Sequence, residues 1–332
     1  MKIDIRNTDA LSLLRSLPDS SVDLIATDPP YFRVKDEAWD RQWAKPSEFV
    51  AWLGTVADEW RRVLKPNGSL YCFASPQMAA RVEVMLADRF AVLGHLVWRK
   101  ETGRHKAACK EALRAFFPAS ERIIFCEQPG SDLLAKGEAQ YVAKCDELRG
   151  FVFEPLRAYL DGERERVGLT AKQCDAACGN QMSGHYFTRS QWTLPTRANY
   201  DKIRAAARAI YGAEFAFRRE YEDLRREYED LRRPFFAVPD APYTDVWTFP
   251  VVPHRPGKHV CEKPSAMMEH IVRTSSRPGA VVLDCFMGSG TTGVAAARLG
   301  RSFIGCDMSG HWCESSRRRI DAESRTLFGS AA

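Results

Sequence analysis

The sequence lacks the features of a membrane protein and of a disulfide-linked secreted framework. It contains no run of about 18 uninterrupted apolar residues, the length that a transmembrane helix needs. Residues 1–25 alternate polar and apolar positions and have no apolar core of a signal peptide. The ten cysteines are scattered singly and form no C-x-x-C pair. We therefore expect reduced thiols in a cytoplasmic protein with no membrane association.

A metal-binding pattern and a strong net charge are also missing. The nearest cysteine pair, Cys174 and Cys178, has no histidine at zinc-finger spacing, so we expect no metal. The 48 Lys and Arg residues against 43 Asp and Glu give a net charge of only +5. Most of these cations are arginines, which suit phosphate and base-edge contacts. A GC-rich genome produces the same excess, so composition alone leaves nucleic-acid binding open.

Two segments of alternating strands and helices flank a stretch of different character. In residues 1–144 the pattern predicts strands at 22–27, 69–74, 90–98 and 122–127 and helices at 47–64 and 79–88. In residues 244–332 it predicts strands at 246–249, 280–283 and 302–306 and helices at 264–276 and 291–299. This alternation predicts one α/β domain with a mainly parallel sheet, built from both ends of the chain.

Residues 145–243 are predicted to form a helical insertion. Helices are expected at 154–167, 171–178, 199–211 and 217–233. The last contains the tandem repeat REYEDLR, whose Tyr and Leu residues form one apolar stripe. Two heptads are too few for an independent coiled coil, so we expect this helix to dock, with partner packing as its role.

The strongest local pattern is LDCFMGSGTT at residues 283–292, between an apolar strand and an Ala-rich helix. Gly288 and Gly290 allow the backbone to approach a ligand and present amides at the helix N-terminus. Asp307 ends the next strand, where a carboxylate can accept hydrogen bonds from a ribose diol. The absence of Gly-Lys-Ser/Thr excludes a P-loop. A dinucleotide site and a simple tight connection both stay open, since Gly293 completes G-x-G-x-x-G.

The second pattern is Asp28-Pro29-Pro30-Tyr31, which follows the strand at 22–27. The two prolines remove two N–H donors but leave carbonyl acceptors beside a carboxylate and an aromatic ring. Acceptors without donors suit a substrate that is itself a donor, such as an exocyclic amino group on a planar ring that Tyr31 stacks against. The alternative is a structural Asp-Pro-Pro turn with a core tyrosine.

The DPPY tetrapeptide followed by the F-x-G-x-G segment resembles the β-class of S-adenosylmethionine-dependent DNA amino-methyltransferases. The resemblance covers residues 1–128 and 245–320. It implies a Rossmann-like class I methyltransferase sheet with a circularly permuted motif order and a helical target-recognition insertion. The segment HVCEKP at 259–264 is similar to the family's H-P-x-x-K-P, whose lysine faces the methionine carboxylate, with Val260 in place of proline.

The resemblance also implies roles for individual residues. Asp28, Pro29, Pro30 and Tyr31 are the expected catalytic residues. The residues expected to bind S-adenosyl-L-methionine are Asp9, Ala10, Asp28, Lys263, Asp284, Phe286, Gly288, Ser289, Gly290, Thr291, Thr292 and Asp307.

The implied activity is site-specific methylation of the N6 amino group of adenine in double-stranded DNA, after base flipping. DPPY rather than SPPY favours adenine, and N4-cytosine is the open alternative. The alternative of a different class is a DNA-binding regulator on an inactive methyltransferase scaffold, against which the intact Asp28 and FMGSG loop argue. The family also implies a homodimer, either solitary or paired with a restriction enzyme.

Two regions are expected to contact DNA. The basic segment 98–122 is expected to lie along phosphates through Arg99, Lys100, Arg104, Lys106 and Lys110. In the insertion, residues 156–208 contain a two-helix-and-turn pattern around residues 168–173, followed by residues 182–192. This pattern resembles a helix-turn-helix, with Arg189 as a contact and His185 as a structural residue. A helical spacer or a dimer contact is the alternative for this second region.

Overall fold

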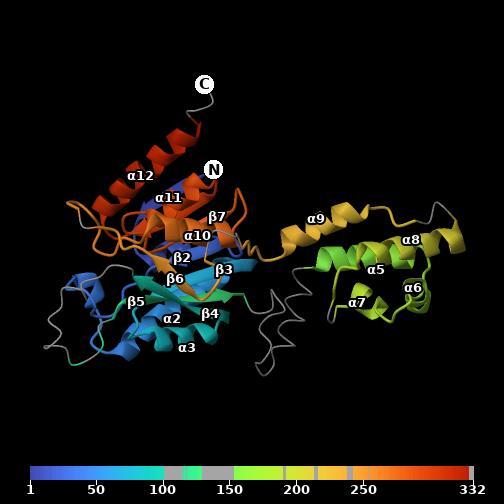
Figure 1. Ribbon diagram of the computed structural model, residues 1–332, viewed down its shortest axis with the longest axis horizontal. Helices are drawn as coiled ribbons and strands as arrows, with labels where there is room; N and C mark the ends of the chain where they lie inside the picture. The colour runs from blue at the N-terminus through green and yellow to red at the C-terminus, as the bar shows by residue number, and fades with distance from the viewer. Residues whose placement is uncertain are drawn as a thin grey trace. The chain divides into compact units, whose positions relative to one another are not determined.

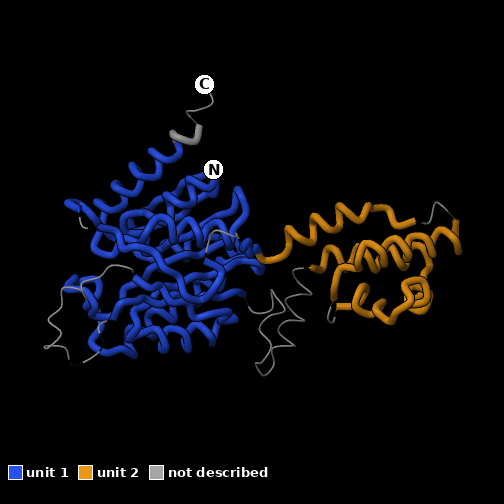
Figure 2. The backbone as a smooth tube through the Cα atoms, in the orientation of Figure 1, with its two compact units in different colours: residues 1–128, 234–332 blue, residues 129–233 orange. Residues whose placement is uncertain are grey.

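The chain divides into two compact units. The computed structural model describes residues 1–100, 114, 116, 118–128, 153–189, 192–212, 216–237, 242–253 and 255–328. Unit 1 comprises residues 1–128 and 234–332, and unit 2 comprises residues 129–233 (Figure 2). Unit 1 is thus built from both ends of the chain. No helix in the described ranges has the length and apolar character needed to cross a membrane.

Unit 1 is organised around a sheet that has eight strands within the described residues, in the order β1-β8-β7-β2-β3-β5-β4-β6 (Figure 1). The strands are β1 (Ile3–Asn7), β2 (Val22–Thr27), β3 (Leu64–Ala74), β4 (Ala91–Lys100), β5 (Ser120–Glu127), β6 (Val246–Phe249), β7 (Val281–Asp284) and β8 (Ser302–Asp307). Strand β5 runs antiparallel to both β3 and β4, and the other pairs are parallel. Strands β2 and β7, from opposite ends of the chain, lie side by side in the middle.

Helices cover both faces of this sheet (Figure 1). On one face lie α1 (Ala10–Arg15), α2 (Pro46–Val63) and α3 (Ala79–Ala87), and on the other α10 (Ser265–Ser275), α11 (Thr291–Arg298) and α12 (Gly310–Phe328). The apolar positions that predicted α2, among them Phe49, Leu53 and Trp60, are fully buried under the sheet. Burial on both faces explains the continuous apolar runs of the central strands. The α/β fold class predicted from the sequence is confirmed.

Unit 2 is helical and has a core of its own. It contains α5 (Glu154–Arg166), α6 (Ala171–Cys178), α7 (Ser183–Phe187), α8 (Arg197–Tyr211) and α9 (Tyr221–Leu231). Helix α6 begins where the sequence predicts, because Thr170 and Gln173 form a capping box. Its core gathers Leu156, Leu160, Cys174, Tyr200 and Phe217.

The tandem-repeat helix differs from its prediction in length and in role. Helix α9 begins only at Tyr221, because the backbone amides of Arg218 and Arg219 donate to Glu163 and to the Tyr159 hydroxyl. Tyr221 and Leu224 are buried in the core of unit 2. The stripe expected to pack on a partner therefore packs within the same unit.

Two boundaries in unit 1 also lie elsewhere than expected. Residues 234–237 belong to unit 1, not to the insertion, since the Phe235 ring lies 6.0 Å from Phe125 and the Phe236 amide donates to the Thr274 carbonyl at 2.8 Å. Strand β3 begins at Leu64 instead of residue 69, and a register shift in its pairing with β2 accommodates Pro66.

The buried carboxylate of Glu163 yields a stability prediction for unit 2. It accepts hydrogen bonds from the side chains of Arg166 and Arg218. Burial alone would raise the pKa of Glu163, but these hydrogen bonds lower it to about 2. We expect Glu163→Gln to destabilise unit 2 by about 1–2 kcal/mol at pH 7, because Arg166 and Arg218 lose their charged acceptor but remain in contact with water. Hydrogen exchange of the α5 and α9 amides in the full chain measures this loss.

The stability that Glu163 gives to unit 2 depends on pH in a defined direction. The folded pKa of Glu163, about 2, lies below its ordinary value of 4.5. The stability that the ionised Glu163 contributes is therefore fully present above pH 4.5 and is lost as the pH falls from 4.5 toward 2. The matched control is Glu165→Gln, because that side chain is 69% exposed and its ion pair is peripheral. Equal protection in the two variants would contradict the assignment.

Candidate functional site

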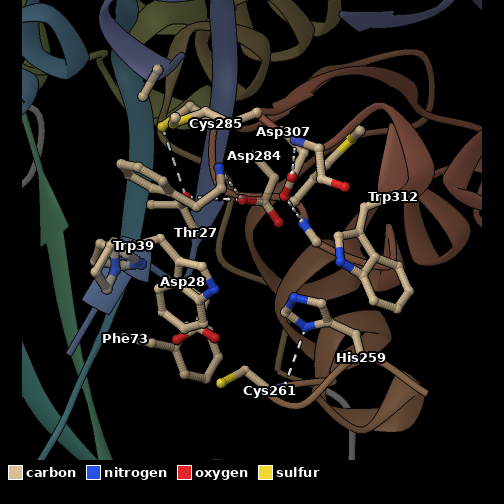
Figure 3. Close-up of a pocket in the computed structure, with 18 of the residues that line it drawn as sticks. Thr27, Asp28, Trp39, Phe73, His259, Cys261, Asp284, Cys285, Asp307 and Trp312 are labelled. Carbon is tan, nitrogen blue, oxygen red and sulfur yellow. Dashed lines mark hydrogen bonds between the residues drawn. The ribbon is translucent and has the colours of Figure 1, made fainter. Parts of the chain in front are cut away.

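A cavity of about 900 Å³ lies at the carboxyl edge of the central parallel strands (Figure 3). Its walls are the segments that follow β1, β2, β7 and β8, together with the loop at 259–263. Open α/β sheets bind ligands at this edge, where parallel strands end side by side. The DPPY and F-x-G-x-G motifs, far apart in the sequence, therefore line one cavity. All described residues that line it belong to unit 1.

Asp284 joins the two motif strands to the helix that follows. At the end of β7 its carboxylate accepts hydrogen bonds from the hydroxyls of Thr27 at 2.9 Å and Thr292 at 2.6 Å, and from the Phe286 amide (Figure 3). Burial raises the pKa of Asp284 to about 6, although these hydrogen bonds oppose the shift. Its carboxylate is thus occupied by protein donors and holds the cavity floor together.

The glycine loop has a shape that side chains would destroy. Gly288 and Gly290 have φ angles of +48° and +75°. A Cβ at Gly290 would lie 2.7 Å from Ser316 Cβ in α12, and one at Gly288 would lie 3.0 Å from the His259 ring. Close approach to α12 and His259 therefore requires glycine at both positions. Directly after the loop, the Thr291 hydroxyl is buried without a hydrogen-bond partner in the described part of the chain.

Two more acidic residues stand at strand ends around this loop. Asp307, after β8, accepts hydrogen bonds from the amides of Gly288 at 3.1 Å and Ser309 at 2.8 Å, and burial raises its pKa. Asp9, after β1, caps α1 by accepting from the Ser12 amide at 2.9 Å. Ala10, Phe286 and Ser289 also line the cavity. The structure thus brings the sequence-predicted cofactor residues together around one space, except for Gly290, which does not line it.

The opposite wall is formed by the DPPY segment and Lys263. The Lys263 ammonium donates to Oδ2 of Asp28 and lies 5.2 Å and 5.0 Å from the ring centroids of Tyr31 and Phe73. Oδ1 of Asp28 is buried and accepts no hydrogen bond from the described residues. Burial raises the pKa of Asp28, against the influence of Lys263. The wall therefore offers a carboxylate oxygen that is ready for a donor.

Glu121 is a member of this site that sequence reasoning missed. From the start of β5, Glu121 accepts hydrogen bonds from the Tyr31 hydroxyl at 2.9 Å and the Lys100 ammonium at 2.6 Å. Lys263 lies 3.3 Å away. Burial alone would raise the pKa of Glu121, but Lys263 and Lys100 lower it to about 2. No local motif marks this residue, because its position depends on antiparallel pairing of β5.

A second unforeseen residue, Asp40, fixes the chain after DPPY. Its fully buried carboxylate accepts from the amides of Tyr31 at 2.7 Å and Lys35 at 2.6 Å. Between them, Phe32 and Arg33 both adopt φ angles of +60°, a left-handed conformation that costs non-glycine residues energy. Asp40 thus stabilises a strained loop, on which the neighbouring Trp39 lines the cavity (Figure 3).

The residues expected to contact DNA have mixed outcomes. Arg99 is exposed near the end of β4, whereas Lys100 forms the ion pair with Glu121. Arg104, Lys106 and Lys110 lie outside the described residues. Arg189 in unit 2 is 73% exposed and lies 3.3 Å from Glu154. Lys100 is therefore better explained as the ion-pair partner of Glu121 than as a phosphate contact.

A comparison with protein families gives a match over most of the chain. The family model described as DNA methylase, of the N6/N4 type, matches residues 22–318. Similar curated proteins include the DNA adenine methyltransferase YhdJ of Escherichia coli, 25% identical over 95% of this chain and 82% of the relative. The type II methyltransferase M1.MboII of Moraxella bovis is 26% identical over 93% of this chain and 92% of the relative.

Solved structures share the fold at low identity. A putative DNA modification methylase from Thermus thermophilus, complexed with S-adenosyl-L-methionine, has a TM-score of 0.52 at 19% identity, covering 97% of this chain and 94% of that one. The cytosine-N4-specific PvuII DNA methyltransferase has a TM-score of 0.53 at 15% identity, covering 99% and 94%.

These matches confirm the resemblance drawn from the DPPY and F-x-G-x-G motifs. The methyl donor of the matching family is S-adenosyl-L-methionine, as the sequence predicts. The family model matches residues 22–318, and the two motif strands meet at one cavity. This protein therefore belongs to the N6/N4 family of DNA methyltransferases.

Proposed function

We propose that this DNA methyltransferase transfers a methyl group to the exocyclic N6 of a flipped adenine at specific sites in double-stranded DNA. The observation that carries the proposal is the buried Oδ1 of Asp28, which accepts no hydrogen bond from the described residues and lines the same cavity as Tyr31. An amino group on a planar base supplies the donor that this oxygen lacks. The similarity to a DNA adenine methyltransferase supports adenine as the base.

The cavity residues fit S-adenosyl-L-methionine, which supplies an electrophilic methyl group on a sulfonium centre. We assign the ribose diol to Asp307 and the adenine region to Asp9, Ala10 and Phe286. The remaining assigned residues are Asp28, Lys263, Asp284, Gly288, Ser289, Gly290, Thr291 and Thr292. One observation supports the fit: the Thr291 hydroxyl, which lines the cavity, is buried without a partner among the described residues.

Asp28 and the neighbouring prolines activate the amino group. Its lone pair is delocalised into the base and is a poor nucleophile. Oδ1 of Asp28 and the Pro29 carbonyl accept its two N–H groups, which localises the lone pair and stabilises the charge that develops on nitrogen. Pro30 fixes the turn, and the Tyr31 ring stacks on the base. Because burial raises the pKa of Asp28, its carboxylate is also suited to hold the proton that the amino group releases.

N4-cytosine is the second candidate base, since its amino group is equivalent and a structural neighbour is cytosine-N4-specific. Digestion of methylated DNA to nucleosides separates the two. We expect N6-methyladenine, and N4-methylcytosine in its place would overturn the adenine assignment. Single-molecule sequencing of DNA from cells that express the protein reports the recognition sequence in the same experiment.

We assign target recognition to unit 2 and phosphate contacts to the segment around Arg99. Helices α5 and α6 follow each other through the left-handed Gly168, as in a helix-turn-helix, and exposed residues lie on both. Arg189, exposed just after α7, is the basic residue that we assign to contact with DNA. The family further suggests a cytoplasmic, nucleoid-associated homodimer, which sedimentation with and without DNA would test.

Removing the Asp28 carboxylate tests the chemistry. We expect Asp28→Ala to lower kcat about 1000-fold, because the transition state loses its charged acceptor. Calorimetry with S-adenosylhomocysteine should show that cofactor binding largely survives, with a Kd raised by no more than about tenfold, because the other residues assigned to the cofactor remain. The control is Asp58→Asn, which removes a surface ion pair to Arg89 and should leave kcat unchanged. Full activity of Asp28→Ala would contradict the mechanism.

Removing the Asp307 carboxylate tests the cofactor assignment. We expect Asp307→Ala to weaken S-adenosylhomocysteine binding about 10- to 100-fold, the effect of losing a charge-assisted hydrogen bond. Calorimetry measures the change directly. Asp4→Ala is the control, because it removes a carboxylate from β1, the strand beside β8, where Asp4 pairs with Arg6 outside the cavity. If both variants bind equally well, Asp307 does not hold the ribose.

A further inference from the structure

Three donors that line or adjoin the base side of the cavity converge on Glu121. Its Oε1 accepts from Lys100 at 2.6 Å, and its Oε2 accepts from the Tyr31 hydroxyl at 2.9 Å and lies 3.3 Å from Lys263. The side chain is 15% exposed, so water screens these contacts little. Such a cluster of charges is more than a turn or a strand end requires.

The sheet explains how Glu121 reaches this place. Strand β5 is antiparallel to β3, so its first residues lie at the edge where β2 and β3 end. Pairing with β4 sets Glu121 opposite Trp98 and brings the end of β4, with Lys100, beside it. An antiparallel strand thereby adds its N-terminal residue to a site that parallel strands otherwise build with their C-terminal ends.

Lys263 has two carboxylates within reach. Its ammonium donates to Oδ2 of Asp28 and lies close to Glu121, with the rings of Tyr31 and Phe73 beside it. Asp28 is the group that the proposed mechanism requires as an acceptor. A lysine bound to Asp28 alone would draw negative charge away from the oxygen that faces the target amino group.

We propose that Glu121 is a positioning residue of the base pocket, which anchors the Tyr31 hydroxyl and shares Lys263 with Asp28. This inference rests on the proposed function of the cavity as the site of a flipped base. In it, Glu121 supplies the second negative charge for Lys263, so that Asp28 stays available to the amino group. The Tyr31 ring is held at the angle at which a base stacks on it.

The negative charge of Glu121, and not only its shape, is essential to this role. Lys263 and Lys100 lower the pKa of Glu121 to about 2, so the carboxylate is ionised at neutral pH. Glutamine has the same size and retains an acceptor for the Tyr31 hydroxyl, but it is neutral. Glu121→Gln therefore separates the charge from the hydrogen bond.

The test uses the full chain and two oligonucleotides with the sequenced recognition site. One carries the natural target base and gives kcat, and in the other a fluorescent analogue replaces that base and reports flipping. We expect Glu121→Gln to lower kcat about 100-fold, the scale of a misplaced catalytic group, and to reduce the fluorescence gain on base flipping. The Kd for S-adenosylhomocysteine should stay within about threefold of the original value, since Glu121 is not assigned to the cofactor. Glu83→Gln is the control, because Glu83 pairs with His95 on β4 outside the cavity.

A double-mutant cycle tests the anchor. Tyr31→Phe keeps the ring but removes the hydroxyl that Glu121 accepts. If the two residues act together, Tyr31→Phe combined with Glu121→Ala should lower kcat by much less than the product of the single effects. Additive effects would overturn the anchoring role.

The possible results distinguish a failure of the Glu121 proposal from a failure of the proposed function. If Glu121→Gln behaves like Glu83→Gln, or loses cofactor affinity and thermal stability together with activity, the positioning role is overturned. If the unaltered protein methylates DNA but shows no fluorescence gain at the target base, the inference also fails. If the unaltered protein methylates only cytosine, the adenine assignment fails, while the comparison of the two variants remains decisive for Glu121.

Discussion

The parallel pairing of β2 with β7 is the contact on which the site depends. It sets Leu24 opposite Val282 and ends at the hydrogen bond from the Thr27 hydroxyl to Asp284, between residues 257 positions apart in sequence. With this register, the strand that ends in DPPY and the strand that ends in the glycine loop finish at the same edge. A shift of one residue would reverse the side chains of β2 between the two faces and misdirect the catalytic segment.

The cavity contains buried charges and strained backbone that cost folding free energy, and the surrounding packing has to offset this cost. Asp28, Glu121 and Lys263 are charged groups largely removed from water, and Phe32 and Arg33 hold strained dihedral angles. Fixed charges of this kind need little rearrangement when charge develops on a substrate, which is how preorganised sites accelerate reactions. The two apolar cores on either side of the sheet supply the stability that offsets this cost.

Features encoded by adjacent residues could be predicted, and features that depend on distant contacts could not. The apolar run of β2 and the start of α6 depend on neighbouring residues, and the sequence predicts both. DPPY and the glycine loop are continuous motifs, so their role in a ligand-binding site could also be predicted. Glu121 and Asp40 reach the cavity only through strand pairing and a folded loop, and neither has a distinctive neighbourhood. The α9 stripe was assigned to a partner because charges surround it, yet unit 2 buries it.

The insertion of unit 2 between β5 and β6 has an evolutionary consequence. Unit 2 has its own apolar core, and all described residues that line the cavity come from unit 1. Recombination that replaced the segment between residues 129 and 233 would therefore leave the chemistry of the cavity unaltered. Such modular exchange provides a route by which a lineage of enzymes diversifies while its reaction stays constant.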